Sequence, residues 1–204
     1  MTAIRHIVFD LGRVLLHWEP ELPYRRLIPD DVARRRFMAE VCNAAWLRET
    51  DLGVTWDEAE RRLIERFPDQ ADMIRAFRRN WHAMVPDTIA DTPEILAELL
   101  AAGYDVTALT NFAEDTYEEA LERFPLLRSF RGVTVSAHAQ LAKPDEAIFD
   151  HHAKAFGLTP AATLFFDDIA ANVAAARRAG WNAEQFIDAA KMRAELHRHG
   201  INVG

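Results

Sequence analysis

Four short stretches of this sequence supply polar side chains that could act together. Each stretch follows a segment with the apolar character of a buried strand, and the side chains are Asp10, Thr110 with Asn111, Lys143, and Asp167 with Asp168. A carboxylate at the end of a buried strand is costly to hold there unless something uses or pairs it. Taken singly, such residues also serve as turn residues or helix caps, and Asp168 could cap a helix that starts near Ala170.

The four stretches meet only if their strands run parallel in one sheet. Strands are predicted at residues 4–9, 105–109, 133–136, 163–166 and 182–186, and the helices between and after the later strands at 114–123, 145–156, 170–179 and 188–199. Alternation of this kind favours right-handed crossovers and a parallel sheet with helices on both faces, an α/β fold of the Rossmann-like type. Reacting groups collect at the carboxyl ends of such strands, so the side chains should share one edge.

The segment from 18 to 88 differs from the rest of the chain in its sequence pattern, because helical patterns follow one another and no strand pattern appears. Thr55 to Glu58 resembles a capping box, in which Thr55 caps a helix and Glu58 reaches back to the cap. We therefore expect a Rossmann-like core formed by residues 1–17 and 89–204, with a helical cap domain at 18–88. Four tryptophans lie in or beside this segment, either as its core or as the lining of a substrate lid: Trp18, Trp46, Trp56 and Trp81.

Composition narrows the classes of partner. The chain has 204 residues, of which 50% are apolar, and a formal charge of −8. This negative charge argues against nucleic acid and anionic membrane surfaces as partners. The first apolar run, residues 7–9, is too short for the core of a signal peptide, and no run approaches the length of a membrane span. The single cysteine, Cys42, excludes an internal disulfide, and the simplest expectation is a cytoplasmic protein.

The sequences FDLGRVL, LTNF, AKPD and LFFDDIAANV, in this order, resemble the four motifs of the haloacid dehalogenase superfamily. Their spacing is similar to that of members with a helical cap inserted after the first motif. Most members are phosphatases. The resemblance implies that Asp10 is a nucleophile that forms an aspartyl-phosphate. It also implies a Mg²⁺ ion held by Asp10, the carbonyl of Gly12 and Asp167, with Asp168 as a further or water-mediated ligand.

The resemblance assigns the remaining motif residues to the substrate. Thr110 and Asn111 would hold phosphate oxygens, with Thr110 counted among the catalytic residues, and Lys143 would neutralise charge on the nucleophile and on the transferring group. Gly12 and Arg13 would lie on the substrate-binding side, although Arg13 could equally have a surface role. The substrate implied is a small phosphorylated molecule, with a sugar phosphate as one candidate.

Position 12 departs from the family pattern. The family's phosphatases usually carry a second Asp two residues after the nucleophile, which protonates the leaving alcohol and then activates water, and Gly12 can do neither. General acid-base help contributes roughly 10² to 10⁴ in rate. His17 and Glu19 are candidates to replace it. Three functions therefore remain open: a magnesium-dependent phosphatase, a 2-haloacid dehalogenase that uses the same Asp, and a phosphate-binding regulatory module without turnover.

Overall fold

A computed structural model describes residues 2–203 and contains a five-stranded sheet in the order β3-β2-β1-β4-β5. All neighbouring strands are parallel. The strands are β1 (His6–Phe9), β2 (Asp105–Thr110), β3 (Val133–Val135), β4 (Thr163–Asp167) and β5 (Asn182–Gln185). This confirms the predicted α/β class. Strands β2 and β4 run one residue further than expected, so that Thr110 and Asp167 are themselves the last strand residues.

Alternation along each strand divides the core into two layers. In β1, Ile7 and Phe9 belong to one hydrophobic cluster and Val8 to another, and all three are fully buried. Such a strand, buried on both faces, is typical of a parallel sheet. Ile7 is paired with Val106 on one side and with Leu164 on the other, which places β1 at the centre of the sheet.

Helices cover both faces of the sheet, as predicted. The cluster that contains Ile7 also includes residues of α7 (Thr92–Ala101), α8 (Glu114–Arg123) and α12 (Ala189–Arg198). The cluster that contains Val8 includes residues of α10 (Glu146–Phe156) and α11 (Ala170–Arg178). The short elements of this part are η2 (Pro125–Ser129), α9 (Ser136–Ala139) and η3 (Pro160–Ala162).

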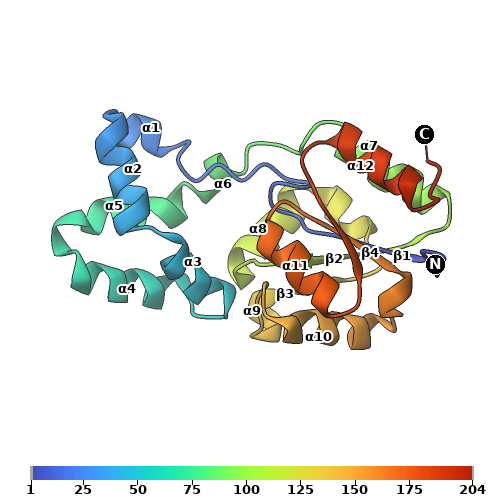
Figure 1. The fold of residues 1–204 in the computed structure, drawn as a ribbon. Helices are drawn as coiled ribbons and strands as arrows, with labels where there is room; N and C mark the ends of the chain where they lie inside the picture. Colours follow the sequence, from blue (N-terminus) through green and yellow to red (C-terminus); the bar gives the residue numbers. More distant parts are fainter. Residues whose placement is uncertain (1, 204) are drawn as a thin grey trace.

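A group of helices between β1 and β2 lies to one side of the sheet, at the left of Figure 1. It consists of α1 (Tyr24–Leu27), α2 (Asp31–Glu40), α3 (Ala44–Asp51), α4 (Trp56–Arg66), η1 (Pro68–Gln70), α5 (Ala71–Arg79) and α6 (Trp81–Met84). Its members share a hydrophobic cluster of their own in which Trp46, Trp56 and Phe77 are in mutual ring contact. We call this group the cap helices.

The chain enters and leaves the cap helices through two segments that lie side by side. His17 donates its backbone N–H to the Asp87 carbonyl, and Ile89 donates to the Leu15 carbonyl, each at 2.9 Å. The boundaries predicted for the two domains fall at this paired connection, and the division into domains stays a prediction.

One local detail differs from the sequence expectation. The Thr55 side chain accepts a hydrogen bond from the Glu58 backbone, as the capping box requires, but the Glu58 carboxylate binds Arg61 and Arg62 instead of reaching back. Glu58 thus pairs with arginines one turn further along the helix, and these ion pairs take the place of the capping-box hydrogen bond to the Thr55 backbone N–H. Within residues 2–203, no helix combines the length and the apolar character needed to cross a lipid bilayer.

Candidate active site

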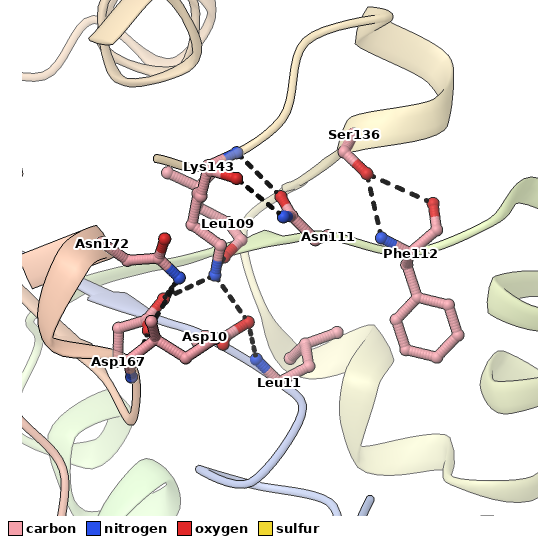
Figure 2. Close-up of polar contacts among 10 residues, drawn as sticks. Asp10, Leu11, Leu109, Asn111, Phe112, Ser136, Lys143, Asp167 and Asn172 are labelled. Carbon is pink, nitrogen blue, oxygen red and sulfur yellow. Dashed lines mark hydrogen bonds and ion pairs between the residues drawn. The ribbon is translucent and has the colours of Figure 1, made fainter. Parts of the chain in front are cut away.

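Lys143 stands at the centre of the predicted site. Its Nζ lies 2.8 Å from Asp10 Oδ1 and 2.7 Å from Asp167 Oδ2, and it also donates to the Leu109 carbonyl at 3.0 Å. Figure 2 shows these groups converging from β1, β2 and β4 and from the loop after α9. Lys143 is 2% exposed and Asp167 0%, so the ion pairs are shielded from water. The sheet thus brings together three of the predicted stretches.

Negative charge exceeds positive charge in this cluster. Ligand oxygens of Asp10, Asp167 and Asp168 all lie within 4.8 Å of one another, and Lys143 is the buried cation among them. Burial raises the pKa of Asp10 to about 7 even though Lys143 opposes the shift, and Asp167 raises it further. Burial and the charge of Asp167 also raise the pKa of Asp168. A second cation would relieve this repulsion.

The donor set fits a hard divalent cation. Asp10 Oδ1 accepts from Lys143 and from the Leu11 backbone at 2.7 Å, while Asp10 Oδ2 receives no hydrogen bond from the residues that the structure describes. Three carboxylates at this spacing supply the oxygen ligands that Mg²⁺ prefers. The residues therefore fit the predicted metal, which the carboxylates of Asp10, Asp167 and Asp168 could hold, and the ligand role of the Gly12 carbonyl stays a prediction.

Asn172 belongs to this site and was missed by the sequence analysis. It lies in the first turn of α11, and its Nδ2 lies 2.9 and 3.0 Å from the two carboxylate oxygens of Asp167. The Ile169 backbone donates to the same carboxylate at 2.8 Å. These donors fix the orientation of Asp167. The signal in the sequence was an Asn five residues after the strand-end Asp167, within LFFDDIAANV.

Thr110, the last residue of β2, and Asn111, which follows the strand, have different surroundings. Thr110 is buried at the strand end. Asn111 uses its side-chain amide on the Lys143 backbone, donating from Nδ2 to the carbonyl at 3.0 Å and accepting from the N–H at 2.9 Å. Asn111 therefore holds the lysine loop against β2, and one amide hydrogen remains for a substrate. The substrate-binding role predicted for it stays a prediction.

The segment after Asp10 contains the remaining predicted residues. Gly12 has an ordinary negative φ, and a Cβ built on it meets no atom within 4 Å, so the position does not require glycine. Arg13 is exposed, adopts a φ of 58°, and donates to the Trp18 carbonyl at 3.2 Å. Its guanidinium lowers the pKa of Asp168 against the effect of burial, so it lies near the acidic cluster.

A largely apolar cavity opens beside this cluster, between the strand-end loops and the cap helices. It encloses about 620 Å³ of empty space, part of which is open to solvent. Its apolar lining consists of Leu16, Trp18, Leu47, Trp56, Trp81, Val85, Phe112 and Ala113. Three of the four tryptophans singled out in the sequence thus face the cavity. Gly12 and Asn111 line its end nearest the carboxylates.

Asp51, the last residue of α3, is a second residue that the sequence analysis missed. It lines the cavity, and burial raises its pKa to about 7 although Lys143 and Arg48 act to lower it. Arg48, three residues earlier, donates to the Lys143 carbonyl at 3.1 Å and so joins α3 to the loop that carries Lys143. No strand end marks Asp51, so the rule that found the other carboxylates could not find it.

Comparison with known proteins decides the family. The haloacid dehalogenase-like hydrolase family matches residues 4–180. The chain belongs to this family of hydrolases. It is 26% identical to the sesquiterpene phosphatase astK of Aspergillus oryzae over 210 residues, which covers 97% of both chains.

Solved structures of the family have the same fold. A predicted HAD-like family hydrolase from Porphyromonas gingivalis is 25% identical, with a TM-score of 0.74 over 97% of this chain and 98% of the other. A HAD family enzyme from Bacteroides thetaiotaomicron, solved with magnesium and inorganic phosphate, has a TM-score of 0.69 at 21% identity over 91% and 96% of the two chains.

An L-2-haloacid dehalogenase from Xanthobacter autotrophicus has a TM-score of 0.67 at 19% identity, over 98% of this chain and 85% of the other. Because an enzyme solved with magnesium and phosphate and a haloacid dehalogenase share this fold, the fold does not choose between phosphate and halide chemistry.

Proposed function

We propose that this hydrolase is a magnesium-dependent phosphatase that acts through an aspartyl-phosphate on Asp10. The observation that carries the proposal is the convergence of Asp10, Asp167 and Asp168 around a single buried lysine. Displacing halide from carbon requires one carboxylate nucleophile and no metal, so three carboxylates would only add repulsion. Phosphoryl transfer instead needs cations at the point where two anions meet.

Each residue has a task in this chemistry. When bound, the Mg²⁺ ion would offset the repulsion between the nucleophile and the phosphate group. Lys143 holds Asp10 Oδ1 at 2.8 Å and so fixes the direction of the carboxylate, while its charge favours the ionised, nucleophilic form. Asn172 and the Ile169 backbone keep Asp167 oriented toward the same point. Thr110 at the end of β2 is the candidate hydroxyl for a phosphate oxygen.

The relative from Aspergillus oryzae and the apolar cavity together favour an apolar substrate. A sugar would present hydroxyl groups to Trp18, Trp56 and Trp81, and each hydroxyl buried there without a partner costs roughly 1 to 3 kcal/mol. An isoprenoid or aromatic group would instead bury apolar surface, at about 25 cal/mol per Å². We therefore favour phosphate monoesters of apolar alcohols over the sugar phosphates considered from the sequence.

The test is a substrate panel measured with magnesium and again with chelator. An isoprenyl monophosphate, an aryl phosphate, a sugar phosphate and a 2-haloacid span the alternatives. We expect magnesium-dependent phosphate release, with kcat/KM at least about tenfold higher for the apolar esters than for the sugar phosphate. Chloride release that persists in chelator would favour the dehalogenase reaction, and phosphate binding without turnover would favour a regulatory module.

A further inference from the structure

One carboxylate in the lining of the cavity, Asp51, has no role in the phosphatase reaction as described so far. Asp51 lines the same cavity as Gly12, the position of the family's usual second Asp, and it lies close enough to Lys143 for that charge to act on its carboxylate. Asp51 ends α3, and this helix lies against α9 of the core, beside which it is drawn in Figure 1. Asp51 therefore belongs to the cap but borders the catalytic edge.

Contacts between cap and core hold Asp51 in this place. Arg48, one turn earlier in α3, donates to the Lys143 carbonyl at 3.1 Å. Gly53, two residues after Asp51, has a φ of +95°, and a Cβ there would lie only 3.1 Å from the Ala137 carbonyl. Any other residue at position 53 would be strained and would push the turn away from the core. The turn that follows Asp51 is thus fitted closely against α9.

Asp51 also lacks the partners that a structural carboxylate would have. Among residues 2–203 it forms no ion pair and accepts no hydrogen bond, whereas its neighbour Glu49 pairs with Arg62 at 3.5 Å. The charged groups that act on it are Arg48 of its own helix and Lys143 of the core, and burial outweighs both, so that its pKa rises to about 7. A group with a pKa near the working pH can both give and take a proton.

We propose that Asp51 is the general acid and base of the reaction, supplied by the cap in place of the carboxylate missing at Gly12. The proposal rests on the proposed phosphatase function. It assigns to the cap a catalytic step as well as substrate contact. An alcohol bound in the cavity leaves its oxygen between the Gly12 and Asp51 ends of the lining, within reach of a proton from the cap.

The reaction has two half-reactions, formation of the aspartyl-phosphate and its hydrolysis. In the first, an Asp10 oxygen forms a bond to phosphorus, the bond from phosphorus to the alcohol oxygen breaks, and that oxygen keeps the electron pair and takes the proton of neutral Asp51. In the second, ionised Asp51 takes a proton from water while the water oxygen attacks phosphorus. The bond from phosphorus to Asp10 then breaks, its electron pair returns to the Asp10 carboxylate, and inorganic phosphate leaves.

The two candidates named from the sequence are less well placed. Glu19 is exposed and does not line the cavity. His17 does line it and is half-buried, so it is the real competitor. His17→Gln therefore belongs in the experiment beside Asp51→Asn, and Glu49→Gln is the matched control because it removes a carboxylate from the same helix without touching the cavity.

The experiment compares an alkyl and an aryl phosphate with magnesium saturating at every pH. For the alkyl ester, Asp51→Asn should lower kcat by roughly 10² to 10³, because the leaving alcohol needs the proton. For the aryl ester the first step should survive and the second should slow, so that an initial burst of phenol appears and phosphorylated protein accumulates, as measured by mass spectrometry. Glu49→Gln should change kcat less than about threefold, and His17→Gln should keep the wild-type dependence of kcat on pH.

The pH profiles provide a readout that a structural role would not alter. In the wild type, kcat for the alkyl ester should fall as pH rises through about 7, because Asp51 loses the proton it must give. For the aryl ester kcat should rise through the same pH, because Asp51 must then accept a proton. Both dependences should disappear in Asp51→Asn, because Asp10 would stay ionised in this pH range when its carboxylate is bound to saturating Mg²⁺.

A rescue variant completes the test. Gly12 has open space for a side chain, so Gly12→Asp in the Asp51→Asn background restores a carboxylate at the usual family position. We expect it to recover at least tenfold of the lost kcat and to abolish the burst. Unchanged kcat and pH profiles in Asp51→Asn, or loss of the pH dependence in His17→Gln instead, would overturn the role of Asp51. A wild type that hydrolyses no phosphate ester would overturn the phosphatase function itself.

Discussion

Two regions that meet at the cavity are built on opposite principles. The strand-end cluster, which we call the charged wall, borders the cavity through Gly12 and Asn111 and is closely paired, with Lys143 between Asp10 and Asp167 and with Asn172 on Asp167. The cap wall, which consists of Leu47, Thr50, Asp51, Trp56 and Trp81, contains one carboxylate, Asp51, that has no ion-pair or hydrogen-bond partner among residues 2–203. Carboxylates held in fixed orientations by ion pairs suit the attack on phosphorus, because this step has the same geometry for every phosphate ester. An unpaired carboxylate in an apolar wall keeps a pKa near neutrality and is free to exchange protons.

The two walls also differ in how easily their side chains could be replaced during evolution. Residues at the strand ends are tied to the backbone of the sheet, because Asn111 holds the Lys143 loop and the Ile169 N–H holds Asp167. The cap is held to the core through side chains, among them Arg48 on the Lys143 carbonyl and Arg78, which pairs with Asp115 and Glu119 of α8. Side chains on the cap can change with the alcohol while the phosphoryl site stays the same.

The largest effect should come from the nucleophile. Asp10→Asn replaces the attacking oxygen by an amide and removes a metal ligand, so phosphate release should fall by roughly 10⁴ or more, in line with losses measured at other nucleophiles. The measurement is a kcat determination with magnesium, together with mass spectrometry for a phosphorylated species, which should be absent. Turnover within tenfold of the wild type would remove Asp10 from the centre of the mechanism.

The second effect tests the pairing of the charged wall. Lys143→Met should lower kcat by about 10³ and also destabilise the fold by roughly 3 to 5 kcal/mol, because Asp10 and Asp167 would lose their shared buried counter-ion. Chemical unfolding measures the loss. The control is Lys191→Met, which removes an exposed lysine from its pair with Glu195 and should cost less than about 1 kcal/mol. Equal stability of the two variants would mean that Lys143 does not anchor the cluster.

The sequence could predict the charged wall because strand ends are recognisable. Residues such as Ile7, Val8 and Phe9 form a continuous apolar run, and parallel strands bring whatever follows them to one edge. The sequence could not predict Asp51, because a carboxylate at the end of a helix is ordinary in any solvated helix. Only the docking of α3 against α9 turns it toward the cavity, and that contact depends on the packing of the whole cap.

The third effect tests the support behind the metal ligands. Asn172→Ala removes the side chain that holds both oxygens of Asp167, so affinity for magnesium should fall about 10 to 100 fold, as is typical when a group that orients a ligand is lost. Titration of activity with magnesium measures it. Because the ligands themselves remain, kcat at saturating magnesium should recover most of its wild-type value. The control Asn182→Ala lies at the far end of β5 and should leave the affinity unchanged.

The smallest effect tests the uncompensated charge of the cap wall. The pKa of Asp51 is about 7 in the folded protein against a usual value of 3.8, so the wild type loses stability as pH rises from about 4 to about 7. Asp51→Asn has no charge to bury and escapes this loss. Because Asp51 is half-buried and partly screened by water, we expect a gain of about 1 to 2 kcal/mol at pH 8, or roughly 2 to 6 °C in Tm.

The gain should vanish at pH 4, where the carboxyl group is neutral in both the folded and the unfolded chain. Thermal unfolding at pH 4, 6 and 8 in chelator gives the comparison without any contribution from bound metal. Glu49→Gln, which removes a paired carboxylate from the same helix, should not show a gain that grows with pH. A variant at position 51 that is no more stable than the wild type at pH 8 would mean that Asp51 is well solvated, and the contrast between the two walls would then disappear.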